Sequence, residues 1–160
     1  DRAPVTDLHD DIGAMEADFS DMTFATEAQV DEFYDEADRR MEATGKRWYF
    51  LVIYTDCFIA PEVWDRFAAR GKNTNIKYGL GTVRVGTSAG TRETIRQRAQ
   101  RDMFRANIHD TRDQAMLALG EMRKRHETLD GKSGAVADGG GTTSISNRAT
   151  CWRSSSIGCR

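Results

Sequence analysis

The chain has few of the residues that build disulfide frameworks or zinc sites. It holds only three cysteines among 160 residues, Cys57, Cys151 and Cys159, and none of them falls in a C-x-x-C pair or in a Cys/His zinc spacing. The three histidines show no short-range ligand spacing either. We therefore expect no metal and no cofactor, and a reducing, cytoplasmic setting is the simplest prediction.

Long apolar runs and a strong charge of one sign are also missing. No stretch approaches the roughly 20 residues that span a bilayer, so we expect no membrane span. The net charge is −2, and residues 1–130 carry 19 basic and 24 acidic side chains. Because an acidic surface repels a phosphate backbone, we expect no nucleic-acid partner.

No catalytic constellation stands out either. Asp10, Asp11 and Asp56 supply carboxylates, but no partner base is evident. Cys57 follows an apolar run and is expected to be a small, half-buried residue rather than a nucleophile. The sequence therefore does not predict an enzyme.

What the sequence does contain is a run of β-branched and aromatic residues, Trp48–Tyr54, typical of a strand buried on both faces. Helical patterns on either side of it favour an α/β fold with helices packed on a sheet. The length suits one domain. We expect a leader over residues 1–11, the domain over 12–130 and a flexible Gly/Ser-rich tail over 131–160.

Strands and helices are expected to alternate four times, as βαβαβαβα, around a single four-stranded sheet. The expected strands cover Ala14–Phe19, Trp48–Tyr54, Leu80–Val85 and Met103–Ile108. The expected helices run from the Thr26 capping box to Gly45, from Pro61 to Gly71, from Thr91 to about Gln100, and onward from Asp110.

This alternation resembles the STAS domain, and specifically its SpoIIAA-like branch. The residues that carry the resemblance lie between about residues 12 and 120: they are the central strand Trp48–Tyr54, the loop Thr55–Pro61, the strand Thr82–Gly86 and the closing segment Phe104–Ala115. In that family, an Asp and a few polar residues lie between the last strand and the final helix. Asp110 and the residues after it match this pattern.

The resemblance implies a non-catalytic module that binds partner proteins, nucleotides or small apolar ligands. Regulatory members are switched by phosphorylation at the start of the helix after the central strand. That position falls near Phe58–Glu62, which holds no hydroxyl and places Glu62 at a helix N-terminus. Thr55 is the nearest alternative acceptor.

Our first functional hypothesis is a partner-binding module. Its contact face would combine the loop after the central strand with the turn Gly86–Thr91, which could also hold an anion, and with a ridge of arginines on the third helix. The predicted partner-binding residues are Thr55, Asp56, Phe58, Glu62, Arg92, Arg96 and Arg101.

A second hypothesis is a carrier or sensor of a small hydrophobic, lipid-like ligand. Tyr54, Phe58 and Trp64 would line an apolar pocket near the carboxyl end of the central strand, where open sheets commonly bind ligands. A third hypothesis is an accessory subunit of an enzyme complex, with the catalytic groups on another chain.

Overall fold

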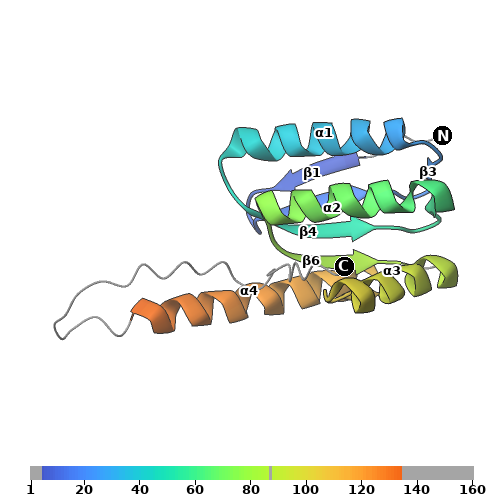
Figure 1. Cartoon of the computed structure of the whole chain (residues 1–160). Helices are drawn as coiled ribbons and strands as arrows, with labels where there is room; N and C mark the ends of the chain where they lie inside the picture. Colours follow the sequence, from blue (N-terminus) through green and yellow to red (C-terminus); the bar gives the residue numbers. More distant parts are fainter. Residues whose placement is uncertain (1–4, 87, 135–160) are drawn as a thin grey trace, which may run out of the picture.

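The computed structural model describes residues 5–86 and 88–134, and within them it shows an α/β fold (Figure 1). A mixed, mostly parallel sheet has five strands: β1 (Val5–His9), β2 (Ala14–Asp18), β4 (Trp48–Ile53), β6 (Gly79–Val85) and β7 (Ile108–His109). Its helices are α1 (Glu27–Thr44), α2 (Trp64–Tyr78), α3 (Ala89–Asp102) and α4 (Arg112–Gly134). Two short strands, β3 (Thr23–Phe24) and β5 (Phe58–Ile59), pair with each other, and a 3₁₀ turn, Pro61–Val63, leads into α2.

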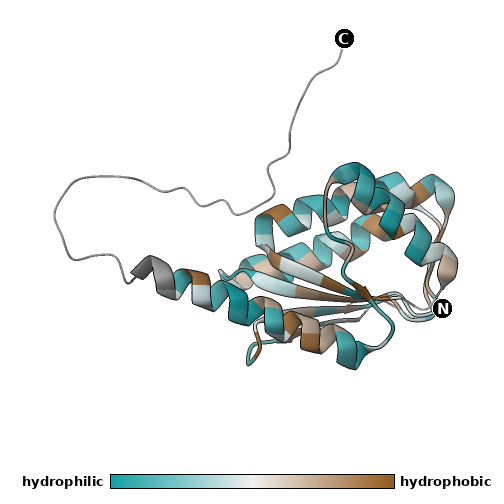
Figure 2. Cartoon of the chain, turned by 90° about the horizontal axis from the view of Figure 1, so that it is seen from below, coloured by the Kyte–Doolittle hydropathy of each residue, from teal (hydrophilic) through white to brown (hydrophobic). Residues whose placement is uncertain are grey.

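The strands of the larger sheet lie in the order β1-β2-β4-β6-β7. β1 runs antiparallel to β2, and all other neighbours are parallel. From β2 onward, each strand is followed by a helix that leads to the next strand of the larger sheet. Right-handed crossovers that all advance in the same direction place their helices on the same face of the sheet. Accordingly, α1, α2 and α3 share one core with that face, whereas α4 packs on the other (Figure 2).

The sheet has five strands rather than the expected four. The additional strand, β1, lies in the segment expected to be a leader, and its sequence Val-Thr-Asp-Leu-His does not alternate between apolar and polar residues. The last strand also begins later than expected: Met103, 89% exposed with φ 59°, ends α3 in a left-handed conformation, and β7 starts only at Ile108.

The central strand β4 is buried on both faces, as the sequence predicted. Trp48 and Phe50 belong to the core beneath α1 and α2, and Tyr49 and Leu51 belong to the core beneath α4. All four side chains are at most 7% exposed. Successive side chains of a strand point to opposite faces, so an unbroken apolar run is what a doubly covered strand requires.

Helix α1 confirms the predicted capping box and stop. The Thr26 hydroxyl accepts a hydrogen bond from the backbone amide of Gln29, and Gly45 ends the helix at φ 65°. Helix α2, by contrast, does not stop at Gly71 but continues to Tyr78. A Cβ at Gly71 would lie 3.1 Å from the Tyr34 hydroxyl, so this glycine permits close packing of α2 on α1.

Helix α4 begins after Asp110, as expected, and reaches Gly134, a few residues into the predicted tail. The rest of that tail, residues 135–160, lies outside the described residues. In the described part of the chain, no helix is long and apolar enough to cross a membrane.

Candidate functional site

A cavity of about 320 Å³ lies between the sheet and the helices on its α1–α3 face. This volume falls at the lower end of the range of small-molecule sites, roughly 300–1,000 Å³. The sheet supplies one side of it through alternate residues of three neighbouring strands: Met15 and Ala17 from β2, Phe50 and Val52 from β4, and Thr82 and Arg84 from β6. The part of this side that β2 and β4 supply is therefore apolar.

Aromatic rings form much of the opposite wall. Phe67 of α2 is 4% exposed, and its ring centroid lies 5.7 Å from that of Tyr34, 5.8 Å from Trp64 and 6.3 Å from Tyr54. Such spacing is typical of packed aromatic clusters. The cavity thus opens beside a rigid group of rings rather than among flexible side chains.

The structure brings together two of the three residues predicted to bind an apolar ligand. Tyr54 and Trp64 both line the cavity, but Phe58 does not. Phe58 lies in β5, which pairs with β3, and its side chain is 58% exposed. Phe58 therefore lies outside this cavity, and its role in binding a ligand stays a prediction.

One charged side chain enters the cavity from the sheet itself. The half-buried Arg84 of β6 donates hydrogen bonds from Nη1 to the backbone carbonyls of Ala106 (2.8 Å) and Arg105 (3.4 Å). Its guanidinium carbon lies 5.2 Å from the centroid of the Phe104 ring. Burial raises the pKa of Tyr54, and the positive charge and a hydrogen bond of Arg84 partly oppose that rise.

Helices α2 and α3 meet at the cavity through few contacts, which we call the α2–α3 seam. Arg98 of α3 binds Asp65 of α2 at 3.0 Å and lies 5.3 Å from the centroid of the Trp64 ring. On α3, Arg101 pairs with its neighbour Asp102, also at 3.0 Å. These charged residues all line the cavity, so its apolar interior has a polar edge at this seam.

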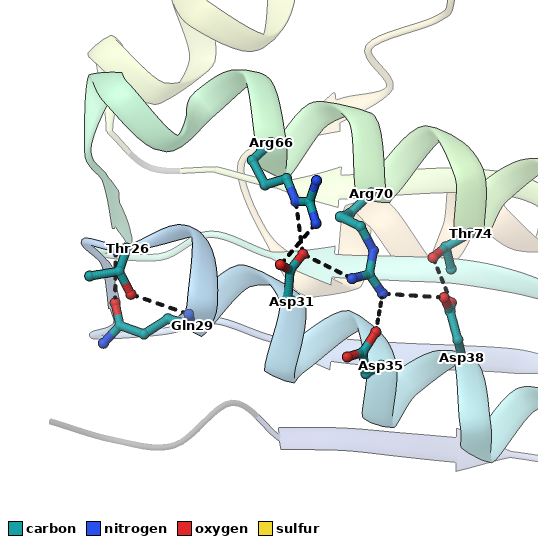
Figure 3. A network of polar contacts seen from close by, with 8 residues as sticks. All are labelled: Thr26, Gln29, Asp31, Asp35, Asp38, Arg66, Arg70 and Thr74. Atoms are coloured by element: carbon teal, nitrogen blue, oxygen red, sulfur yellow. Dashed lines mark hydrogen bonds and ion pairs between the residues drawn. The ribbon is translucent and has the colours of Figure 1, made fainter.

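Helices α1 and α2 are joined by a polar network, which we call the α1–α2 seam (Figure 3). Three acids at helical spacing on α1, Asp31, Asp35 and Asp38, point toward α2. Five contacts build the seam: Arg66–Asp31 (2.8 Å), Arg70–Asp31 (2.9 Å), Arg70–Asp35 (2.7 Å), Arg70–Asp38 (3.6 Å) and Thr74–Asp38 (2.6 Å). The pKa of Asp31 is lowered by hydrogen bonds from Arg66 and Arg70 and by their charges, against desolvation.

The predicted partner-binding residues are only partly gathered. Thr55, Asp56, Phe58 and Glu62 follow β4, and the N-terminus of α3 follows β6; because β4 and β6 are parallel neighbours, both segments lie at the same edge of the sheet. The arginines of α3, however, do not form one free ridge. Arg92 pairs with Asp110 and Arg101 with Asp102, whereas Arg96 is exposed and forms no ion pair with the residues that the structure describes.

The described residues also bear on thiol and metal chemistry. Burial raises the pKa of the Cys57 thiol to about 12, so almost none of it is thiolate at neutral pH. Over residues 5–86 and 88–134, no three His, Cys, Asp or Glu side chains are grouped as metal ligands would be.

Sequence reasoning missed Arg84, Arg98 and the polar residues Thr74 and Asn75 of the cavity wall. A signal existed for Arg84. It alternates with the buried Val83 and Val85 in a parallel strand, and both faces of a parallel strand are usually covered, so an arginine there points into the protein. For α2, the early stop expected at Gly71 left Thr74 and Asn75 outside any helix.

A scan against models of known protein families found no match to this chain, and a search of curated proteins found no significant match either.

Proposed function

We propose that this chain is a non-catalytic, STAS-like module that binds a small, mainly apolar ligand in the cavity beneath α2. The observation that carries the proposal is the cavity itself, about 320 Å³ in volume, lined by apolar sheet residues and by Tyr54 and Trp64. Well-packed cores leave few voids larger than a water molecule, so a space of this size at the sheet is a candidate binding site.

The STAS-like assignment is supported by the order of elements. From β2 to α4 the larger sheet is built of four successive strand–helix units, the alternation on which the resemblance was based. After the central strand, β5 and the 3₁₀ turn Pro61–Val63 lead directly into α2, in keeping with the loop and helix on which the resemblance was partly based.

The proposal is tested by filling the cavity. Ala68 is a half-buried residue of α2 that lines the cavity, and Ala43 is an exposed residue of α1 that does not. We expect 1-octanol to raise the melting temperature of the wild type and of Ala43→Phe, but not of Ala68→Phe. Equal responses of the two variants, or no response of the wild type, would contradict the proposal.

A second candidate function is binding of a protein partner at the edge of the sheet where β4 ends. The observation that favours it is Phe58, a large apolar side chain that is 58% exposed beside Asp56 and Glu62. Native mass spectrometry of the protein from its own host separates the two functions. A protein complex that is lost in Phe58→Ser supports partner binding, whereas a small bound mass lost in Ala68→Phe supports the cavity.

A further inference from the structure

The cavity contains an arginine whose charge is not neutralised within the described part of the chain. Arg84 is half-buried, and no carboxylate of residues 5–86 or 88–134 forms an ion pair with it. Among the described residues, its partners are two backbone carbonyls, the Tyr54 hydroxyl and the Phe104 ring. A charge withdrawn from water without a counter-charge is costly.

The acids of the cavity wall are already engaged elsewhere. The charged residues that line the cavity are Lys72, Arg84, Arg98 and Arg101 on the basic side and Asp65 and Asp102 on the acidic side. Asp65 is bound by Arg98, and Asp102 is bound by Arg101. The lining therefore has an excess of positive charge, and its acids are paired away from Arg84, so the wall favours an anion over a neutral or cationic ligand.

The guanidinium also has hydrogen-bonding capacity left for a ligand. It carries five N–H donors in a planar fork. Two carbonyls and one hydroxyl account for three of them, which leaves at least two. A carboxylate accepts two parallel N–H donors from an arginine, which makes it a well-matched anion for this fork.

The cavity also limits the size of the ligand. An apolar cavity of roughly 150 Å³ takes one benzene molecule, so a cavity of about 320 Å³ takes a ligand of roughly a dozen non-hydrogen atoms. A body of this size against Met15, Ala17 and Phe50 would have to be apolar, because these side chains offer no hydrogen-bond partner.

From the charge, the free donors and the volume, we infer that the ligand is a small monocarboxylate with an apolar body, whose carboxylate binds Arg84 while the body lies against β2 and β4. This inference rests on the proposed function and adds the chemical class of the ligand. The same chemistry is shared by medium-chain fatty acids and by aromatic carboxylates.

The test compares octanoate with octanamide, which has the same length and a neutral polar end, and with 1-octanol. Affinities are measured by calorimetric titration of the full chain near neutral pH. For the wild type we expect octanoate to bind at least tenfold more tightly than octanamide. For Arg84→Met we expect that preference to disappear while 1-octanol still binds within about twofold of its wild-type affinity.

Two controls keep the result interpretable. Arg39→Met removes an arginine from the exposed side of α1, where it pairs with Glu36 away from the cavity, and should leave the preference intact. Arg84→Lys retains the charge without the planar fork and should retain only part of the preference. The comparison of ligands on the wild type stands even if an Arg84 variant does not fold.

The outcomes separate the inference from the proposed function. Equal affinity of the wild type for octanoate and octanamide would overturn the carboxylate inference, and so would octanoate binding that is unchanged in a folded Arg84→Met protein; 1-octanol binding would still support the cavity in both cases. If none of the three ligands binds the wild type, the proposed function fails as well.

Discussion

The two sides of helix α2 are held very differently. At the α1–α2 seam, Arg70 alone reaches three acids of α1, and its side chain is only 15% exposed. At the α2–α3 seam, the described residues form one ion pair, Arg98–Asp65, whose acid is 92% exposed. An exposed pair of this kind contributes little to stability, whereas removing one partner of a shielded network leaves the other charges uncompensated and costs more.

The difference suggests which side of the cavity is fixed and which can move. Helix α1 contributes five buried residues to the core, whereas α3 contributes only Ile95 and Ala99. The cavity lies where the weakly held helix meets the firmly held one. A ligand that enters between α2 and α3 would displace few contacts, and the α1–α2 pair would keep the binding surface in shape.

The largest change in the free energy of unfolding should come from removing one buried side chain from α1 and one from α3. Phe33 of α1 and Ile95 of α3 are similarly buried, at 6% and 5% exposure. We expect Phe33→Ala to lower the free energy of unfolding by about 4 kcal/mol and Ile95→Ala by about 2 kcal/mol. The smaller value reflects the smaller side chain of Ile95 and the few buried residues of α3, because both side chains line the cavity. Equal losses in urea denaturation would mean that α3 is held as firmly as α1.

A smaller change in the free energy of unfolding should come from replacing the arginines of the two seams. We expect Arg70→Met to cost about 2 kcal/mol, because it leaves acids of α1 without their shielded partner. Arg98→Met should cost less than about 1 kcal/mol, because its partner is exposed. The two variants are matched in the substitution and nearly matched in exposure, 15% against 17%. A reversed ranking in denaturation experiments would contradict the comparison.

Hydrogen exchange should detect the same contrast without any mutation. We expect backbone amides in the middle of α3 to exchange through openings about 1–2 kcal/mol less costly than those that expose the middle of α1. A ligand bound in the cavity should slow exchange in α3 more than in α1. Equal protection of the two helices would argue against α3 as the movable side.

The smallest effect should appear in the pH dependence of the α1–α2 seam. The pKa of Asp31 is lower in the folded protein than its ordinary value of 3.8, chiefly because Arg66 donates hydrogen bonds to it. The stability that this shift provides is therefore present above about pH 4 and is lost as the pH falls through the folded value.

Melting curves of the wild type and Asp31→Asn test this dependence. We expect the two melting temperatures to converge as the pH falls from about 5 to about 3. The melting temperature of Asp102→Asn should converge less with that of the wild type. Asp102 pairs with the adjacent Arg101, and the unfolded chain can also form this contact. Curves that stay parallel for Asp31→Asn would show that ionisation of this carboxylate does not stabilise the seam.

Much of the fold could be predicted from short-range patterns. The unbroken apolar run predicted β4, the Thr26–Gln29 capping box and Gly45 predicted α1, and Asp110 marked the approach to α4. The prediction failed where a local signal had a tertiary cause. Gly71 looked like a stop, but it is the point at which α2 approaches Tyr34.

The candidate site was predictable only in part. Tyr54 and Trp64 could be placed near the end of the central strand because they follow it directly in the sequence. Arg84 and Arg98 could not be assigned to the same cavity, because their meeting depends on how β6 and α3 pack against α2 and the other strands. Phe58, which was predicted to line the same pocket, lies instead in the two-residue strand β5 with an exposed side chain.

The sequence by itself therefore determined the class of the fold, the central strand and the ends of the best-marked helix, because backbone hydrogen bonding and side-chain periodicity act over a few residues. Only the tertiary structure decided that three acids of α1 face α2, that α3 is held loosely, and that Arg84 enters an apolar cavity without a carboxylate partner among the described residues. Those features arise from contacts between segments distant in the chain, and no local period encodes them.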